Sequence, residues 1–221
     1  MARLAGKLRH ALVAVVMLAA APALAEVRLA ALGDSLTQGY GLAQGEGLVP
    51  QLQAWLQDQG HAVSVLNAGV SGDTTAGGLS RLDWTLGDNP DAMLVALGGN
   101  DLLRGIEPSA SRANLDAILT GLADAGVPAM LIGLPAPGNY GPEYQDEFEA
   151  MYAELAAEHG VAFHPDLLQP ITARNEQGQS VSDLMQDDNI HPNAQGVALI
   201  VESLGPVVSE FLATIAAESD S

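Results

Sequence analysis

The chain has 221 residues, no cysteine, and a formal net charge of −19 that comes from 27 acidic residues against 8 basic ones. Without cysteine it has no disulfides, no thiol nucleophile and no thiol to carry a lipid. Its acidity argues against nucleic acid or an anionic membrane as a lasting partner, because both are bound through basic patches.

The first 25 residues have the pattern of a secretory signal peptide. Three basic residues precede the apolar run 11–18, and Ala23-Leu24-Ala25 has the form of a cleavage site. The apolar run is too short for a stable membrane anchor, and we expect no later segment able to span a bilayer. We therefore expect export across the inner membrane, to the periplasm or the extracellular space, and one mature domain over residues 26–221.

Residues 26–221 carry all 27 acidic residues but only five basic ones, so their formal charge is about −22. The one lysine of the chain, Lys7, lies before them. The mature protein therefore cannot use serine–lysine or Schiff-base catalysis, which leaves attack by a hydroxyl group with histidine as the base. We expect a soluble protein of monomer size.

Apolar runs alternate with helical patterns along the mature chain. Runs rich in Val, Leu and Ala predict buried strands at Val27–Leu32, Ala62–Leu66, Ala92–Leu97, Val127–Leu134 and Val161–Phe163. The segments between them predict helices at about 48–59, 75–86, 109–125 and 143–159, and a last helix after Pro192 that breaks at Gly205-Pro206 and resumes to about Ala216. This alternation predicts a three-layer α/β/α domain with a parallel sheet covered on both faces. We expect its five strands in the flavodoxin-like order 2-1-3-4-5.

Residues with catalytic potential follow three of these strands. Ser35 follows the first, Gly72 the second and Asn100 the third. In parallel sheets, ligands bind beyond the carboxyl ends of the strands, at the point where the strand order reverses. Since the predicted order places the first and third strands side by side, we expect Ser35 and Asn100 to be neighbours.

Ser35, within the sequence Gly-Asp-Ser-Leu-Thr, is the candidate nucleophile, and His191 is the candidate base. Asp188 lies three residues before His191, close enough for its carboxylate to reach the imidazole and fix its tautomer. Asp187 is one residue too far upstream, and we assign it to solvent. Each residue alone has an ordinary alternative, because Ser35 could cap a helix and His191 could lie in an acidic surface loop.

The candidate donors to an oxyanion are the backbone N–H groups of Ser35 and Gly72 and the side-chain amide of Asn100. Their alternatives are a plain turn glycine and a plain turn asparagine. We interpret three neighbouring carboxylates as acceptors of backbone N–H bonds in turns: Asp34, Asp73 and Asp101. We expect three histidines to lie at the edges of helices and strands without partners: His61, His159 and His164.

Together these segments resemble the SGNH, or GDSL-type, hydrolases. The phrases that look like the bacterial periplasmic thioesterase I/lysophospholipase/arylesterase group are G-D-S-L-T-x-G-Y, N-A-x-V-S-G-D-T-T, L-G-G-N-D-x-L-R-G, N-Y-G and M-Q-D-D-N-I-H-P-N. The resemblance runs from about Val27 to Leu212. It implies hydrolysis of carboxylic esters and thioesters of acyl chains, with no cofactor and no metal.

Four apolar residues are candidates for contact with the acyl chain: Leu102, Leu103, Ile106 and Tyr140. Their alternative is core packing for the three aliphatic residues and a turn position for the tyrosine. The segment 134–141 departs from the pattern of the group by an added proline and glycine, which leaves the preferred chain length open.

Three other functions fit the sequence less well. A carbohydrate O-acetylesterase belongs to the same superfamily but needs no long apolar groove. A non-catalytic carbohydrate- or lipid-binding module on a hydrolase fold is disfavoured because every catalytic position is filled. A metal phosphoesterase is disfavoured further, because the chain has no H-x-H motif or clustered metal ligands.

Overall fold

The computed structural model describes residues 26–219, so the predicted signal peptide lies outside the described residues. Five strands pair in parallel to form one sheet in the order β2-β1-β3-β4-β5. This order confirms the predicted topology. The strands are β1 (Val27–Gly33), β2 (Val63–Gly69), β3 (Ala92–Ala96), β4 (Ala129–Ile132) and β5 (Ala162–His164).

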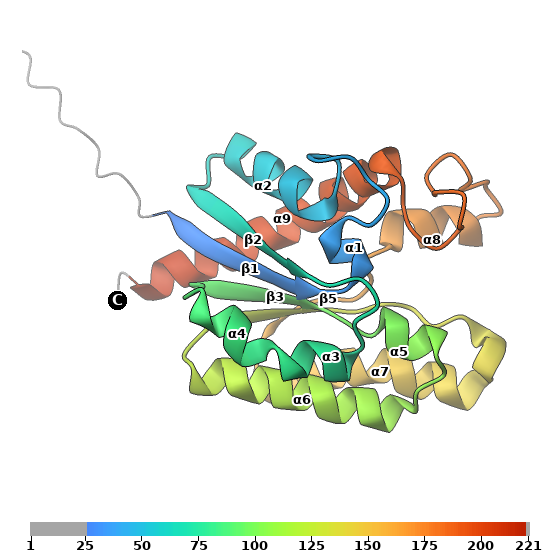
Figure 1. The fold of residues 1–221 in the computed structure, drawn as a ribbon, viewed down its shortest axis with the longest axis horizontal. Coiled ribbons are helices and arrows are strands. Elements are labelled where there is room, and N and C mark those ends of the chain that lie inside the picture. Colours follow the sequence, from blue (N-terminus) through green and yellow to red (C-terminus); the bar gives the residue numbers. More distant parts are fainter. Residues whose placement is uncertain (1–25, 220–221) are drawn as a thin grey trace, which may run out of the picture.

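Helices cover both faces of the sheet, which gives the predicted three layers (Figure 1). One face carries α2 (Leu48–Asp58), α8 (Gln169–Glu176) and α9 (Ala194–Ser219). The other carries α3 (Thr75–Ser80), α4 (Leu82–Gly87), α6 (Pro108–Asp124) and α7 (Pro142–His159). The short helices α1 (Ser35–Gln38) and α5 (Gly99–Leu103) begin directly beyond the ends of β1 and β3.

Side chains of the strands alternate between two cores, one on each face of the sheet. Leu29 and Ala31 of β1 belong to the core beneath α2 and α9, whereas Ala30 and Leu32 belong to the core beneath α6 and α7. Because both faces are buried, the strand is apolar from Leu29 to Gly33, and its one charged residue, Arg28, lies at its exposed start. Truncation of the fully buried Leu29 to alanine is expected to cost about 2–5 kcal/mol of folding free energy.

The last helix corrects one prediction. α9 runs through Pro206 without a break, although a break was predicted at Gly205-Pro206. Pro206 lies on the exposed face, where solvent can bond the carbonyl that loses its N–H partner. Gly205 serves packing: a Cβ there would come within 2.6 Å of the Trp55 ring on α2. Its neighbours Leu204 and Val208 are fully buried and hold the helix on both sides of the proline.

Other boundaries differ in smaller ways. β2 extends to Gly69 rather than Leu66, and the predicted helix 75–86 divides at Arg81 into α3 and α4. The short helices α1, α5, α8 and the 3₁₀ turn η1 (Gly138–Tyr140) were not predicted, because one or two turns contain too few residues to show a helical period.

Among the described residues, one helix is long and apolar enough by length and composition to cross a membrane, at Ala194–Ala217 within α9. This corrects the expectation that no such segment follows the N-terminal region. Half of the apolar window is buried inside the protein. Val201, Leu204 and Val208 lie in the core shared with α2, which is the packing of a core helix.

β2 forms one of the two edges of the sheet. Two side chains of α2 bond to the backbone groups of β2 that point away from β1. Gln53 Oε1 accepts the Val65 N–H at 2.8 Å, and Gln57 Nε2 donates to the Val63 carbonyl at 2.9 Å. The helix that covers this face of the sheet therefore also covers part of its edge.

Candidate active site

The candidate residues gather at the carboxyl ends of the strands, near α1 and α5 in Figure 1. Ser35 begins α1 directly after β1, and Asn100 lies in α5 directly after β3. β1 and β3 are neighbours in the sheet, and both residues line one pocket together with His191. Gly72 lies in the loop that follows β2, the other neighbour of β1.

Ser35, His191 and Asp188 form a continuous chain of hydrogen bonds. The Ser35 Oγ lies 2.8 Å from His191 Nε2, and His191 Nδ1 lies 2.6 Å from Asp188 Oδ2. The arrangement suits an imidazole that carries its proton on Nδ1, donates it to Asp188, and accepts the serine hydroxyl at Nε2.

Asp188 is held ionised by a turn of its own loop. Its Oδ1 accepts the backbone N–H groups of Ile190 at 2.9 Å and His191 at 3.0 Å. The N–H of His191 first, and then its imidazole and the N–H of Ile190, lower the pKa of Asp188 to about 2. Asn189 adopts a positive φ of 54°, which lets the chain fold back on the carboxylate. Asp187 is exposed, as expected.

The loop that carries His191 is tied to the serine side of the site. The Gln186 Nε2 donates to the Tyr40 carbonyl at 2.8 Å and to the Pro192 carbonyl at 3.0 Å. A single antiparallel bridge joins Met185 and Pro192. The Tyr40 ring lies against the imidazole, with the ring centres 4.7 Å apart. These contacts hold the His191 imidazole beside the Ser35 hydroxyl.

The backbone donors beside the serine are unoccupied. Within residues 26–219, neither the Ser35 N–H nor the Gly72 N–H has a hydrogen-bond acceptor. Gly72 has a φ of +85°, a backbone conformation that favours glycine. The same loop is joined to the end of β1 by the Val70 N–H, which donates to the Gly33 carbonyl at 3.1 Å. Free donors at this place can bind a developing negative charge.

The turn that carries Asn100 depends on Gly98. Its φ of +125° lies in a region that other residues rarely adopt, and a Cβ there would collide with the Tyr152 hydroxyl. That hydroxyl donates to the Leu97 carbonyl at 3.0 Å, so the turn is fixed from beneath by the core. The motif glycine before Asn100 is therefore required by packing as well as by conformation.

Asp34 lies between Ser35 and Asn100 and is 3% exposed. Its Oδ1 accepts the Leu36 N–H at 3.0 Å, as expected for a turn carboxylate, and its Oδ2 lies 3.4 Å from Asn100 Nδ2. Burial raises the pKa of Asp34 to about 6. The Leu36 N–H, the electrostatic attraction of the His191 imidazole and the Asn100 amide lower this pKa, but by less than burial raises it. The sequence did not predict the link to Asn100.

Asp101 also accepts bonds, but from another segment. It is fully buried and accepts the Thr75 N–H at 2.8 Å, the Thr75 hydroxyl at 2.6 Å and the Ser111 hydroxyl at 2.9 Å. Asp73 departs from the predicted role, because it pairs with Arg81 at 2.5 Å instead of accepting a backbone N–H. The three motif carboxylates thus join different segments of the site.

An apolar pocket of about 140 Å³ opens beside Ser35 and His191. Two of the four predicted substrate contacts, Leu102 and Leu103, line it, whereas Ile106 and Tyr140 are not part of its lining. Tyr140 instead packs on Tyr144, whose hydroxyl donates to the Ile106 carbonyl. The sequence missed four apolar lining residues that come from three other loops: Leu134, Pro135, Leu168 and Ile190.

The other histidines correct a prediction. His61 lies 2.6 Å from the Ser209 hydroxyl, and His159 lies 2.7 Å from Asp116, so both have partners. His164 is buried, its Nε2 has no partner among the described residues, and burial lowers its pKa. None of the three lines the pocket beside Ser35. In the part of the chain that the structure describes, no three metal-binding side chains cluster.

A serine hydroxyl bonded to an imidazole, the imidazole bonded to a carboxylate, and free N–H groups beside the serine define a serine hydrolase site. Its position at the carboxyl edge of a parallel sheet of order 2-1-3-4-5 defines the class more narrowly, as an SGNH-type hydrolase.

The chain belongs to the GDSL-like lipase/acylhydrolase family, which matches residues 31–199. It is 36% identical over 185 residues to esterase TesA of Pseudomonas aeruginosa, a match covering 83% of this chain and 89% of that protein. It is also 36% identical over 172 residues to the thioesterase 1/protease 1/lysophospholipase L1 of Escherichia coli K12, covering 77% of this chain and 78% of that protein.

The crystal structure of the psychrotrophic esterase EstA from Pseudoalteromonas sp., inhibited by monoethylphosphonate, superimposes with a TM-score of 0.77 at 31% identity. The match covers 84% of this chain and 98% of that chain. These findings confirm the predicted family and fold, and the protein is an ester hydrolase.

Proposed function

We propose that this protein hydrolyses carboxylic esters and thioesters of acyl chains through an acyl-enzyme formed on Ser35. The observation that carries the proposal is the unbroken chain of hydrogen bonds from Ser35 through His191 to Asp188, beside an apolar pocket. The names of the two relatives, an esterase and a thioesterase/lysophospholipase, support this substrate class.

In the first half of the reaction, the Ser35 oxygen attacks the acyl carbon while its proton passes to His191 Nε2. The carbonyl oxygen becomes an oxyanion, and Asp188 stabilises the imidazolium. When the bond to the alcohol or thiol breaks, His191 returns the proton to the leaving group. In the second half, a water molecule repeats the attack with the same base and releases the acid and free Ser35.

The oxyanion would be held by the N–H groups of Ser35 and Gly72 and by the amide of Asn100. Two of these donors have no other acceptor in the described residues, so they need no rearrangement when charge develops. The bond from Asn100 to the buried Asp34 holds the amide group in place.

The pocket indicates the size of the substrate. It is apolar on the side of Leu102, Leu103 and Leu134, which suits an acyl chain, and its volume of about 140 Å³ suits a small or single-chain ester. Nothing in the chemistry requires a cofactor. On the basis of the N-terminal signal pattern, we further propose that residues 26–221 act as one exported domain in the periplasm or outside the cell. We also propose that this domain acts as a monomer.

The test combines labelling with a substrate series. Purified protein is treated with a fluorophosphonate probe, and rates are measured on p-nitrophenyl esters from acetate to palmitate, one acyl-CoA and one lysophospholipid. We expect a label on Ser35 and hydrolysis of short and medium esters and of the thioester. Activity confined to acetate and to acetylated sugars would favour a carbohydrate O-acetylesterase. A protein that takes no label and hydrolyses none of these would be a binding module.

A further inference from the structure

Arg81 contacts both strands that lead to the proposed oxyanion donors. It lies between α3 and α4, and its side chain is 17% exposed. Its Nη2 donates to the Gly33 carbonyl at 2.8 Å, at the end of β1, and its Nη1 donates to the Ala68 carbonyl at 2.6 Å, near the end of β2. Its Nε donates to Asp73 at 2.5 Å.

We propose that Arg81 is a positioning residue that sets the distance between the Ser35 N–H and the Gly72 N–H, the two backbone donors of the oxyanion hole. The inference rests on the proposed function of that hole. The residues that Arg81 bonds lie close in sequence to the two donors: Gly33 is two residues before Ser35, and Asp73 directly follows Gly72. A shift of the guanidinium would therefore move both donors.

The chemistry of arginine suits this role. A guanidinium is planar and offers five N–H donors in a fixed fork, so it can hold three acceptors in one rigid geometry. A lysine ammonium could replace the charge but not this geometry. Asp73 is 20% exposed, so the pair is shielded from solvent. The bridge holds the loop after β2 in one place relative to the end of β1.

Two buried carboxylates complete a ring around the site. Asp34 links the end of β1 to Asn100 after β3, and Asp101 links the turn after β3 to Thr75 after β2. Arg81 supplies the third link, between the ends of β1 and β2. Each two of the three donor segments are thus joined by a charged side chain.

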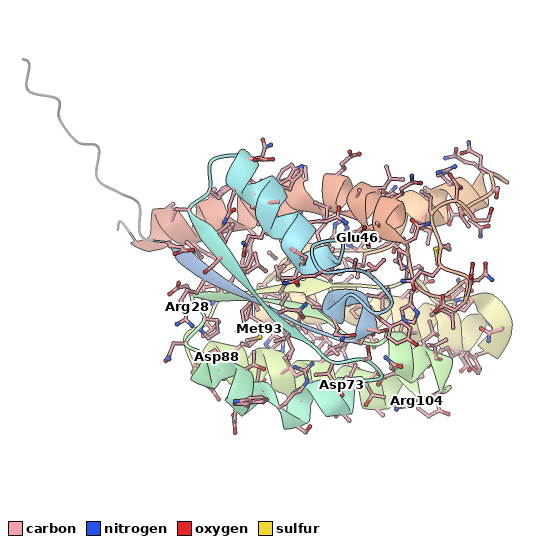
Figure 2. All side chains as sticks on the ribbon, turned by 45° about the horizontal axis from the view of Figure 1, so that its top comes forward. Arg28, Glu46, Asp73, Asp88, Met93 and Arg104 are labelled. Atoms are coloured by element: carbon pink, nitrogen blue, oxygen red, sulfur yellow. The ribbon has the colours of Figure 1, made fainter. Side chains whose placement is uncertain are left out.

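Arg104 also bonds to the loop after β2, but it differs from Arg81 in its exposure and its partners. Its Nη2 donates to the Gly72 carbonyl at 2.8 Å, but the side chain is exposed and, within residues 26–219, its guanidinium bonds to no other segment. Asp73 and Arg104 lie at the same end of the molecule, whereas Arg28 and Asp88 lie at the other (Figure 2). A role in positioning is therefore assigned to the shielded arginine that joins two strands.

The experiment compares wild type with Arg81→Lys and Arg81→Ala. Arg112→Lys is the matched control, because Arg112 pairs with two glutamates on the surface between α6 and α7. Four quantities are measured: kcat and KM on p-nitrophenyl butyrate, the affinity for a trifluoromethyl ketone whose serine adduct carries an oxyanion, and the thermal midpoint.

In the Arg81 variants we expect kcat to fall about 10- to 100-fold with KM nearly unchanged, since a misplacement of about 1 Å costs up to about 100-fold. Affinity for the ketone should fall by a similar factor, because it also depends on the oxyanion donors. Added guanidinium ion should restore part of kcat in Arg81→Ala. Arg112→Lys should match wild type in every quantity.

A folded Arg81→Lys protein with unchanged kcat, a loss confined to KM, or a fall in kcat without a fall in ketone affinity would overturn the proposal. If neither Arg81 variant folds, Asp73→Asn decides: it keeps both carbonyl bonds and should lower kcat by a smaller factor, and an unchanged kcat would overturn the proposal. Wild-type protein that is neither labelled nor active would instead refute the proposed function itself.

Discussion

Two carboxylates flank the Ser35–His191 pair, and their surroundings act on them in opposite directions. Asp188 lies in an exposed loop and accepts two backbone N–H bonds and the imidazole, which lower its pKa to about 2. Asp34 is 3% exposed, and burial raises its pKa to about 6. The comparison teaches that hydrogen bonds determine the pKa of a carboxylate close to solvent, whereas desolvation determines the pKa of a carboxylate from which solvent is excluded.

The largest effect tests the residues that lie between the two carboxylates. Ser35→Ala should abolish fluorophosphonate labelling and lower kcat by about 10⁴-fold or more, and His191→Ala should cost a similar factor, because the members of such a set act as a unit. Mass spectrometry of the labelled protein and steady-state rates measure this. A label on Ser71 or Ser182 in the Ser35→Ala protein would contradict the assignment of the nucleophile.

The exposed carboxylate should matter next. Asp188→Asn is expected to lower kcat by up to about 10⁴-fold while the protein stays folded, because the imidazole loses the partner that fixes its tautomer. Asp187→Asn is the matched control, one residue away on the same loop, and should behave as wild type. If instead the Asp187 variant lost the activity, the two carboxylates would have to exchange roles.

The partner of the buried carboxylate should give a smaller loss. Asn100→Ala removes one donor to the oxyanion and should lower kcat by about 10²–10³-fold with KM little changed. The control is Asn114→Ala, which removes an amide bonded to Thr75 and not to Asp34. A change in KM alone would make Asn100 a residue that binds substrate in the ground state.

The smallest effect separates the two carboxylates by their linkage to pH. The pKa of Asp34 is raised in the folded state, so folding is favoured while Asp34 is protonated, and that stability is lost as the pH rises from about 4 to about 6. The pKa of Asp188 is lowered, so its contribution is present above about 4 and is lost as the pH falls toward 2.

Thermal midpoints from pH 2 to pH 8 measure how each carboxylate changes stability with pH. Asp34→Asn should be more stable than wild type at pH 7, by about 1–3 kcal/mol, and should lose this advantage near pH 4. Asp188→Asn should be less stable than wild type at pH 5 and equal to it near pH 2. Parallel curves for the two variants would show that the opposite environments of the carboxylates do not affect folding.

The sequence predicted those features that depend on neighbouring residues. Asp188 and His191 lie three residues apart. Each of the three donor residues follows a strand that its apolar composition predicts: Ser35, Gly72 and Asn100. The expected flavodoxin-like strand order placed Ser35 and Asn100 together, because it makes the first and third strands neighbours. Residue spacing and strand composition are local in sequence, and the strand order follows from general rules for connecting parallel strands.

Contacts made only in three dimensions were not predictable. The three bonds of Arg81 join segments 8 to 48 residues away in sequence, and nothing local marks them. In the pocket wall, Leu168 comes from a loop with no motif, and nothing in the motif around His191 marks Ile190 as a lining residue. Gly205-Pro206 was read as a helix break by a local rule, but the packing of Trp55 against Gly205 and the buried residues around it override that rule.

The side chains that cover the edge of β2 have a consequence for self-association. An open edge strand is a template on which another chain can pair and start an aggregate. Here Gln53 and Gln57 occupy the outward N–H of Val65 and the outward carbonyl of Val63. Since both glutamines are fixed on a helix packed against the same strand, an incoming chain would have to displace them to form its first rungs. The edge is protected by amide groups rather than by charge.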